Sequence, residues 1–536
     1  MHLSTVIPQP SRVAPGAGVW RWRYRSHWSR GHLLRIATGA SARLEPQAEL
    51  LAGYLREENL AAAALVPGEE GDIVLTLSSA GPGPMPAALA EAGFEPEWHR
   101  IHVEPERIRV EAGAPAGIAR AVQTLRQLLS GQRARLELPC GRIEDAPALG
   151  WRGLHLDVAR HFRTAAEVRR YIDLAALHKL NLFHWHLTDD QGWRLPVEGY
   201  PRIEEIAAWR EGTLVGHDCD RATSPIDGIP HGGCYTAEEI RETVAYAAAR
   251  GVQVLPEVDV PGHVQALVTA YPEFGNTGRP PGVRTCWGIS DTTLNLEPGT
   301  FAFLERVVET LAGLFPFRYL HFGGDEARTG EWAASERIQE RKRELGLCED
   351  REVQHHFTRE LQRFAARHGR RMIGWDEIVE AGPLPEGAAV MYWRDSDSEE
   401  GLDVQALRAG APVVLANCSR TYFDHYQKAG EGMDFEPLAI CGNLPIEKVY
   451  AWEPLERYPA ELQPGVLGAQ AQAWTEYIPT RAHLDYMVYP RACALAQVLW
   501  TGPAREGWAD FERRLESHLP RLDRLGVAYR PRLPLP

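Results

Sequence analysis

Short apolar runs alternate with stretches of helical periodicity from residue 151 onward. Eight apolar runs stand out, at residues 153–158, 182–187, 252–258, 319–323, 371–374, 388–392, 412–416 and 466–473. Strand-like runs separated by helices are typical of βα units, whose strands form a parallel sheet. Eight such units close on themselves, so the pattern predicts an α/β fold with a (β/α)8 TIM barrel over residues 147–536.

Two of the helices between these runs begin with a recognisable signal. In each, a threonine is followed three residues later by a glutamate, the spacing of a capping box, in which the two residues satisfy each other's backbone N–H groups. The pairs are Thr164 with Glu167 and Thr236 with Glu239. A last helix is expected around residues 511–525, packed on the barrel, and the end of the chain, residues 531–536, is expected to be a loose tail.

Aromatic residues and arginines are interleaved near the start of the chain, in residues 20–35. Strict alternation places Trp20, Trp22 and Tyr24 on one face of a strand and the arginines on the other. A nucleic-acid surface with stacking platforms would have a similar composition. The alternation favours the strand.

The rest of the N-terminal part also predicts a sheet with a helix. Strands are expected at residues 73–77 and 101–110, and apolar residues from Ile118 to Leu129 recur at helical spacing, so that one apolar stripe lies on the sheet. Residues 1–146 are therefore predicted to form a small α+β accessory domain. Residues 141–147 are expected to be the linker to the barrel.

Composition limits the classes of partner. The 536 residues carry a formal net charge of −14, which favours solubility and disfavours a polyanion such as nucleic acid. No run of about 18 apolar residues is present to span a membrane, and the first residues lack the basic start and apolar stretch of a signal peptide. We expect a cytoplasmic protein that binds neither nucleic acid nor membrane, with homo-oligomerisation left open.

The eight cysteines are scattered through the chain without a CxxC pair. Free thiols in a reducing cytoplasm are expected. Cys219 and Cys234 are close enough in sequence to form a disulfide, so their pairing stays open.

Polar or aromatic side chains follow all eight runs, at the strand ends where barrel enzymes place their catalytic groups. The first four runs are followed by Arg160 and His161, by Asp189 and Asp190, by Glu257, Asp259 and His263, and by Asp325 and Glu326. The last four are followed by Trp375, Asp376 and Glu377, by Trp393, by Tyr422 and Asp424, and by Trp474 and Glu476. Each residue alone has a structural explanation, but eight coincident strand ends predict one site. Acids ringed by tryptophan and tyrosine indicate a stacked, hydrogen-bonded sugar ring.

The fourth run ends in two glycines and two adjacent carboxylates, Gly323-Gly324-Asp325-Glu326. Because successive side chains of a strand point to opposite faces, neighbouring acids reach one substrate only where the backbone leaves strand geometry. The glycines permit that departure, so we expect a turn here.

Four segments together resemble one known family. They are LDVARHF at 156–162, KLNLFHWHLTDDQGW at 179–193, EVDVPGH at 257–263 and HFGGDE at 321–326. These segments are similar to the motifs of glycoside hydrolase family 20, which contains the β-N-acetylhexosaminidases. The resemblance covers essentially the whole chain, including a helix at 121–129 that is typical of the family's N-terminal accessory domain.

The resemblance implies an exo-acting β-N-acetylhexosaminidase that removes terminal N-acetylglucosamine or N-acetylgalactosamine with retention of configuration. No cofactor or metal is expected from the residues. Glu326 matches the general acid/base, and Asp325 matches the residue that holds the 2-acetamido group, whose carbonyl oxygen attacks C1 to form an oxazolinium ion. Tyr422 matches the donor to the acetamido oxygen, and Asp189 and His263 match a pair behind the acid. The other matches are the aromatic cage, Trp375, Trp393 and Trp474, and the groups that hold sugar hydroxyls, Arg160, Asp424 and Glu476.

Three alternatives stay open at this point. Asp424 or Glu476 could be an enzymic nucleophile opposite Glu326, giving double displacement without an acetamido group. The alternating His184 and His186 could hold a metal ion, or could simply fill the barrel. The chain could also be a carbohydrate-binding protein that has lost catalysis, although every matched catalytic residue is present.

Two features of substrate choice are also left open. Preference between the two amino sugars depends on contacts to the sugar's O4. Residues 276–291, which include Trp287, either shape the outer subsites or form a plain surface loop.

Overall fold

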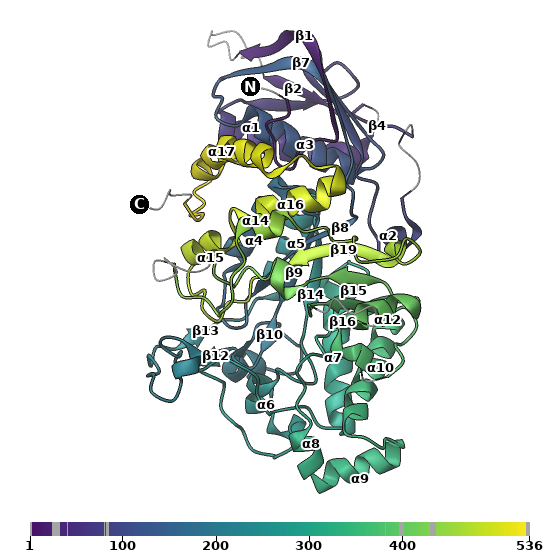
Figure 1. Cartoon of the computed structure of the whole chain (residues 1–536), viewed down its shortest axis with the longest axis vertical. Coiled ribbons are helices and arrows are strands. Elements are labelled where there is room, and N and C mark those ends of the chain that lie inside the picture. The colour runs from purple at the N-terminus through teal and green to yellow at the C-terminus, as the bar shows by residue number, and fades with distance from the viewer. Residues whose placement is uncertain are drawn as a thin grey trace.

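The computed structural model describes residues 3–23, 33–39, 41–79, 81, 85–380, 382–395, 401–428 and 436–531. Its larger part is the predicted barrel, closed by eight parallel strands and surrounded by helices (Figure 1). The strands are β8 (Trp151–Asp157), β9 (Leu182–His186), β14 (Gln253–Glu257), β15 (Tyr319–His321), β16 (Arg371–Trp375), β17 (Ala389–Tyr392), β18 (Val413–Leu415) and β19 (Val466–Ala471). Each overlaps one predicted run, because the strands of a parallel barrel are buried on both faces and read as continuous apolar segments.

Helices connect successive strands and cover the outside of the barrel. The longer ones are α4 (Ala165–Leu177), α5 (Ala237–Ala249), α7 (Pro298–Leu314), α9 (Glu336–Leu345), α10 (Arg351–Arg367) and α16 (Arg491–Thr501). Shorter ones are α6 (Gln265–Ala270), α8 (Gly330–Ala334), α11 (Glu377–Glu380), α12 (Leu402–Arg408), α13 (Cys418–Thr421), α14 (Ile446–Tyr450) and α15 (Arg481–Val488). Both predicted capping boxes are present, at the starts of α4 and α5.

The N-terminal part is a seven-stranded sheet in the order β1-β7-β5-β6-β4-β2-β3. Its elements are β1 (Arg12–Arg23), β2 (Leu34–Ala37), α1 (Glu45–Asn59), β3 (Ala63–Val66), β4 (Ile73–Leu77), β5 (His99–Val103), β6 (Ile108–Ala112), α3 (Pro115–Leu129) and β7 (Arg135–Asp145). The apolar side chains of α3 are buried in one core with the sheet. The predicted α+β class and the helix ending at Leu129 are confirmed.

The strand predicted at residues 20–35 is shorter than expected at its far end. Trp20 and Trp22 are buried and the intervening arginine is exposed, as the alternation predicts. The strand ends at Arg23, however, and residues 34–37 form a separate strand elsewhere in the sheet. Tyr24 lies outside the described residues.

Two further predictions for this domain were wrong. The single strand expected at 101–110 is an antiparallel pair, β5 and β6, which turns between Glu104 and Arg107. Pro105 lies in the turn, where its missing N–H costs no ladder hydrogen bond. Residues 141–145, expected to be a linker, continue β7 and pair with both β1 and β5.

Residues 85–94 of the first domain close the N-terminal end of the barrel. Helix α2 (Ala87–Glu91) and Phe94 share one buried cluster with residues at the starts of barrel strands. The Phe94 ring centroid lies 5.8 Å from that of Trp151 and 5.7 Å from that of Phe317, both edge to face. The first domain therefore seals the end of the barrel opposite the one where catalytic groups are expected.

Truncation of Phe94 tests this role. Phe94→Ala is expected to lower the free energy of unfolding by about 3–5 kcal/mol, because it leaves a cavity where a buried aromatic ring packs. Urea unfolding followed by tryptophan fluorescence measures the change. Activity per folded molecule is expected to stay at the wild-type value, and a destabilisation below about 1 kcal/mol, as for an ordinary substitution, would show that the ring does not seal the barrel.

Buried ion pairs join the two domains beside this contact. Glu97 accepts hydrogen bonds from Arg120 Nε at 2.7 Å and from Arg152 Nη2 of β8 at 2.5 Å. Lys179 Nζ of the barrel lies 2.6 Å from Asp145 Oδ2 of β7. Because removing one partner would leave a buried charge unpaired, these contacts fix how the domains sit on one another.

Helix α17 (Trp508–Arg524) bridges the two domains. Phe511 and Leu522 belong to the barrel core, as the prediction of packing on the barrel requires. Arg521 Nε also donates to the Gln127 backbone oxygen at 3.0 Å, so the helix lies against α3 as well (Figure 1). Of the predicted tail, only residue 531 is described.

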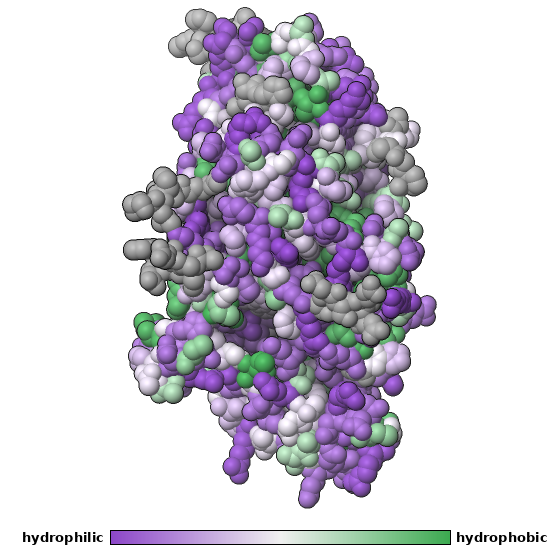
Figure 2. Space-filling model, in the orientation of Figure 1, coloured by the Kyte–Doolittle hydropathy of each residue, from purple (hydrophilic) through white to green (hydrophobic). Residues whose placement is uncertain are grey.

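The connection from β9 to α5 carries two small hairpins. They are β10 (Thr188–Asp189) with β11 (Gly192–Trp193), and β12 (Trp209–Arg210) with β13 (His231–Gly232). Trp209, Val215, Ile226 and Ile229 are exposed there, and Figure 2 shows hydrophobic residues gathered at the lower left of an otherwise mainly hydrophilic face.

Two observations bear on thiols and membranes. All eight cysteines are free thiols, including Cys219 and Cys234, which do not pair. In the described part of the chain, no helix combines the length and apolarity needed to cross a bilayer.

Candidate active site

A cavity of about 710 Å³ opens at the C-terminal ends of the barrel strands. Ten of the eleven residues matched to the family line it, namely Arg160, His263, Asp325, Glu326, Trp375, Trp393, Tyr422, Asp424, Trp474 and Glu476. The exception, Asp189, is buried behind His263 and lies 3.1 Å from its Nδ1 atom. The fold thus gathers these side chains from strand ends far apart in the sequence. The other residues predicted at strand ends, His161, Asp190, Glu257, Asp259, Asp376 and Glu377, are not among its lining residues.

The backbone leaves strand geometry directly after β15, as the paired glycines predict. The angle φ is +60° at Gly323, +92° at Gly324 and +51° at Glu326. A Cβ atom at Gly323 would lie 1.7 Å from Asp259 Oδ1, so no larger residue fits. Glu326 occupies the left-handed region that non-glycine residues rarely adopt, a strain typical of functional sites. This turn carries Asp325 and Glu326 into the same cavity.

Glu326 is backed by a buried histidine and aspartate, and we call Asp189, His263 and Glu326 the acid relay. His263 Nδ1 donates to Asp189 Oδ1, and His263 Nε2 lies 3.5 Å from Glu326 Oε2. Burial lowers the pKa of His263, but the carboxylates of Asp189 and Asp259 outweigh it and raise that pKa well above its usual value. Burial raises the pKa of Glu326, but the adjacent charged His263 outweighs it and lowers that pKa. These opposite shifts favour a proton on His263 beside a Glu326 carboxylate.

Asp325 lines the cavity, and one of its carboxylate oxygens has no protein partner among the described residues. Its Oδ1 atom is buried and accepts no hydrogen bond from any described residue, while its Oδ2 lies 3.6 Å from His263 Nε2. Burial and the charge of Asp259 raise the pKa of Asp325 well above its usual value. A buried polar atom without a partner is costly, so a ligand N–H placed against Oδ1 would be stabilised there.

Four of the aromatic rings that line the cavity lie next to one another. Ring centroids are 5.8 Å apart for Trp375 and Trp474, 6.4 Å for Trp474 and Tyr422, and 6.4 Å for Tyr422 and Trp393. Trp375 is held in place by the hydrogen bond from its Nε1 to Glu257 Oε1, at 2.9 Å. Rings fixed in this way offer apolar faces to the C–H face of a sugar.

Arg160 and two acids supply the polar contacts of the cavity. Arg160 Nη1 lies 3.8 Å from Glu476 Oε1, and Asp424 Oδ1 is buried without a hydrogen-bond partner in the described part of the chain. Asp157, which was not predicted as a site residue, holds Arg160 Nη1 at 3.3 Å and accepts the Thr475 backbone N–H at 3.0 Å. It therefore joins the loops after β8 and β19, and its place in the LDVARHF segment was the available signal.

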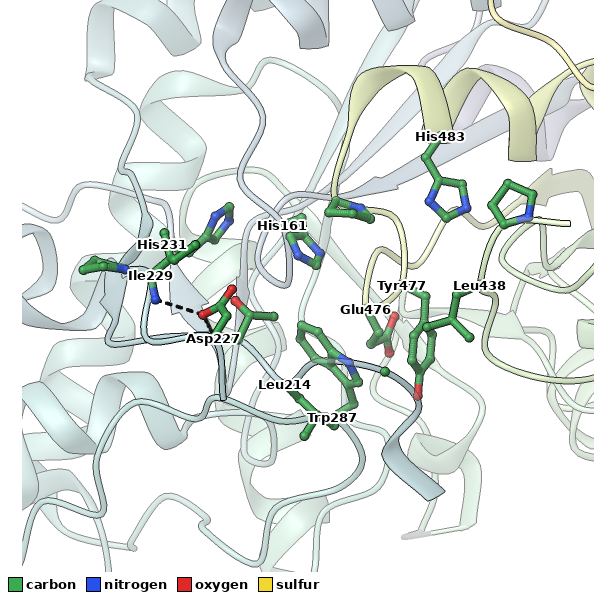
Figure 3. Close-up of a pocket in the computed structure, with 15 residues that line it drawn as sticks. His161, Leu214, Asp227, Ile229, His231, Trp287, Leu438, Glu476, Tyr477 and His483 are labelled. Atoms are coloured by element: carbon green, nitrogen blue, oxygen red, sulfur yellow. Dashed lines mark hydrogen bonds between the residues drawn. The ribbon is translucent and has the colours of Figure 1, made fainter. Parts of the chain in front are cut away.

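Trp287 forms a wall of the cavity, so the segment at 276–291 is more than a surface loop. Its side chain is buried, and its ring centroid lies 6.2 Å from that of Tyr477, which was not predicted as a site residue. A second cavity of about 460 Å³ shares Trp287, Glu476 and Tyr477 with the first (Figure 3). These three side chains line both spaces. Glu476 was predicted from its strand end, and the sequence signal for Trp287 was a tryptophan in a Gly/Pro-rich segment.

The alternating histidines of β9 lie inside the barrel and are fully buried. His184 Nε2 and His186 Nδ1 lie 3.1 Å and 2.6 Å from Glu257 Oε2. Ligand-type atoms of His155, His184 and Glu257 lie within 4.8 Å of one another. His184 Nδ1 accepts a hydrogen bond from Gln470 at 2.8 Å, so this nitrogen already has a protein partner. The histidines fill the barrel, which was one of the two interpretations of the sequence.

A (β/α)8 barrel with paired acids in an aromatic-walled cavity at its strand ends defines the class of sugar-processing barrel proteins. Comparison with known families identifies the family within this class. Residues 149–503 match the catalytic domain of glycosyl hydrolase family 20, and residues 3–146 match domain 2 of the same family. The chain belongs to glycosyl hydrolase family 20.

Two relatives illustrate the similarity. A β-hexosaminidase of Porphyromonas gingivalis is 36% identical over 507 residues, which are 92% of this chain and 61% of that protein. A β-N-acetylhexosaminidase of Cellulomonas fimi is 36% identical over 435 residues, covering 81% of this chain and 80% of that protein. The chain thus spans less than two thirds of the Porphyromonas protein but most of the Cellulomonas one.

Solved structures share the whole fold. The GH20 β-N-acetylhexosaminidase of Streptomyces coelicolor A3(2) superimposes with a TM-score of 0.81 at 31% identity, covering 100% of this chain and 98% of that chain. The GH20 exo β-N-acetylglucosaminidase of Vibrio harveyi, in complex with N-acetylglucosamine, gives a TM-score of 0.81 at 29% identity, covering 99% and 79%.

Proposed function

We propose that the protein is an exo-acting β-N-acetylhexosaminidase, which removes terminal N-acetylglucosamine or N-acetylgalactosamine from glycosides and oligosaccharides with retention of configuration. The observation that carries the proposal is the buried, unpartnered Oδ1 of Asp325 beside Glu326. An acetamido N–H is the partner that this oxygen lacks. The names of the relatives and the sugar in the Vibrio harveyi structure support the same substrate class.

In this reaction the two acids act on different parts of one sugar. Glu326 protonates the glycosidic oxygen as its bond to C1 breaks, and the carbonyl oxygen of the substrate's acetamido group attacks C1. Asp325 accepts the acetamido N–H and stabilises the positive charge of the oxazolinium ion. Glu326, now a carboxylate, takes a proton from a water molecule. This water attacks C1, which opens the oxazolinium ring and restores the β configuration.

The expected contributions of the internal nucleophile and the general acid to the rate are both large. A well-oriented internal nucleophile contributes about 7–11 kcal/mol of barrier reduction that a bimolecular attack lacks. A positioned general acid adds roughly 10²- to 10⁴-fold in rate. The proton on His263, 3.5 Å from Glu326 Oε2, keeps the acid supplied within the site.

An enzymic nucleophile is less well supported. Burial and the charge of Glu476 raise the pKa of Asp424 well above its usual value. Burial also raises the pKa of Glu476, with Arg160 opposing the shift and Asp157 adding to it. A raised pKa narrows the pH range in which either acid is a carboxylate, and double displacement would leave Asp325 without a role.

Two chromogenic aryl β-glycosides with the same leaving group test the proposal. The N-acetylglucosaminide is expected to be hydrolysed, and the glucoside, which lacks the internal nucleophile, is expected to be nearly inert. Glu326→Gln, which cannot act as an acid, controls for contaminating activity. Efficient hydrolysis of the glucoside would refute the assisted route, and binding of N-acetylglucosamine without any turnover would favour a carbohydrate-binding protein.

The opposite pKa shifts of the two acids predict a bell-shaped pH dependence of kcat/KM. Asp325 acts as a carboxylate, and because its pKa is raised, activity is expected to rise with pH above the ordinary aspartate range near ~4. Glu326 acts with a proton that it shares with His263, so activity is expected to fall as pH rises through the pKa of that pair. Initial rates across the pH range measure both limbs. Full activity at about pH 4 would contradict the raised pKa of Asp325.

A further inference from the structure

His186, at the end of β9, joins two carboxylates inside the barrel. Its Nδ1 lies 2.6 Å from Glu257 Oε2, and its Nε2 lies 3.0 Å from Asp189 Oδ2. A carboxylate oxygen accepts hydrogen bonds and does not donate them, so both contacts are hydrogen bonds only if each ring nitrogen carries a hydrogen. The geometry therefore defines a positively charged imidazolium held between two acids.

The neighbouring His184 shows the contrast. Trp151 Nε1 donates to Gln470 Oε1 at 3.2 Å, which leaves the Gln470 amide nitrogen to donate to His184 Nδ1. The single hydrogen of a neutral His184 then lies on Nε2, which is 3.1 Å from Glu257 Oε2. His184 satisfies its partners as a neutral ring, whereas His186 does so only with a charge.

Asp189 is consequently shared among three cationic groups. Its Oδ2 lies 2.8 Å from Arg160 Nη2 and 3.0 Å from His186 Nε2, and its Oδ1 lies 3.1 Å from His263 Nδ1. Each cation offsets part of the negative charge that the others experience. With His186 and Arg160 present, Asp189 orients His263 but holds its positive charge less strongly than an isolated carboxylate would.

We propose that His186 is a positioning residue of the acid relay, whose charge, clamped by Glu257, allows His263 to pass its Nε2 proton to Glu326. The proposal rests on the proposed function, because it concerns the acid of that reaction. The step is balanced: the His263 Nε2–H bond breaks, the Glu326 Oε2–H bond forms, and the imidazolium and carboxylate become a neutral pair. After the acid has protonated the leaving group, the relay regains its proton from the attacking water.

Glu257 ties this relay to the wall of the cavity. Its Oε2 holds His186, and its Oε1 accepts the Nε1–H of Trp375, a ring that lines the cavity. One buried carboxylate thus fixes both the sugar-facing ring and the histidine behind the acid. Burial raises the pKa of Glu257, but the surrounding histidines outweigh it and lower that pKa well below its usual value, so this anchor is charged.

The charges around His186 come from several elements. The titratable groups near His186 and its partners Glu257 and Asp189 are the acids Asp157 and Asp259, the histidines His155, His184, His321 and His263, and Arg160. Burial lowers the pKa of His186, but Glu257 and then Asp189 outweigh it and raise the pKa to about 10. The ring is therefore charged across the whole range in which the enzyme would work.

Two glutamine variants of the same strand test the proposal. Removing the positive charge of His186 raises the pKa at which the His263 and Glu326 pair loses its proton. The basic limb of kcat in His186→Gln is therefore expected to move to higher pH. More of that proton stays on His263, so the maximal kcat is expected to fall by about 10- to 100-fold, as is usual when an outer hydrogen-bonding partner of a site group is lost. His184→Gln also replaces a buried imidazole beside Glu257, but it removes no charge, so its basic limb is expected to stay at the wild-type pH.

An unmoved basic limb in His186→Gln, or equal movement in both variants, would overturn the proposal. If His186→Gln does not fold, ¹⁵N spectra of the histidine side chains in the wild-type enzyme decide instead. At about pH 8.5, two units above the ordinary histidine value, the His186 ring is expected to be doubly protonated. A singly protonated His186 would overturn the proposal. Wild-type hydrolysis of the N-acetylglucosaminide tests the function separately, so the two failures are distinguishable.

Discussion

Replacing Glu326 with alanine is expected to lower kcat by about 10²- to 10⁴-fold for a glycoside with a poor leaving group, the contribution typical of a positioned general acid. An alkoxide leaves slowly without a proton, whereas an acidic phenol leaves as its anion. The loss is therefore expected to shrink as the leaving group becomes more acidic. Steady-state kinetics on a series of aryl N-acetyl-β-glucosaminides measure this, with a steep dependence on the phenol pKa in Glu326→Ala and a shallow one in the wild-type enzyme.

Azide provides the control for this variant. It fits the space left by the side chain and needs no general base, so it attacks the oxazolinium ion where water requires Glu326. Azide is expected to restore turnover of a substrate with a good leaving group and to yield the β-glycosyl azide. An equal loss on all leaving groups, without rescue, would instead indicate a folding defect or a different acid.

Asp325→Ala is expected to lower kcat by about 10²- to 10³-fold on N-acetylglucosaminides, the range for loss of one group that stabilises transition-state charge. The acetamido nitrogen becomes positive only as the ring closes. The lost interaction is therefore stronger in the transition state than in the ground state, and kcat is expected to fall more than KM rises. Asp325→Asn keeps the size of the side chain but not its charge. Any activity that Asp325→Asn retains above that of Asp325→Ala measures the contribution of hydrogen bonding without charge.

Stability measurements distinguish this catalytic loss from misfolding. Because Asp325 Oδ1 is buried without a partner in the described part of the chain, removing the carboxyl is expected to leave the free energy of unfolding unchanged or to raise it. Urea unfolding of wild type and Asp325→Ala provides the comparison. A variant that is destabilised and retains full kcat would contradict the role assigned to Asp325.

The barrel and most of the site could be predicted from the sequence for a physical reason. Strands buried on both faces appear as apolar runs, and the residue that follows such a run lies at the mouth of the barrel. That rule alone predicts that residues as distant in sequence as Arg160 and Glu476 share one cavity, and they do. The turn at Gly323 was predictable too, because adjacent acids can share a substrate only where the strand ends.

Other features depend on contacts that no local pattern encodes. The charge of His186 follows from two acids that approach it from β14 and β10, and the role of Phe94 follows from the docking of one domain on another. The prediction of a linker at residues 141–145 was wrong because strand pairing with β1 and β5, not local composition, decides their structure. Trp287 is far from any strand end, so the rule that found the other site residues did not apply to it.

The central claim is that the substrate's own acetamido group is the nucleophile. Substrates in which the acetamido methyl carries zero, one, two or three fluorine atoms test it most directly, because each fluorine withdraws electrons and makes the carbonyl oxygen less nucleophilic. With one common leaving group, kcat is expected to fall steeply and steadily along the series. A kcat that stays level across the four substrates would show that the acetamido oxygen does not attack C1, and would contradict the account.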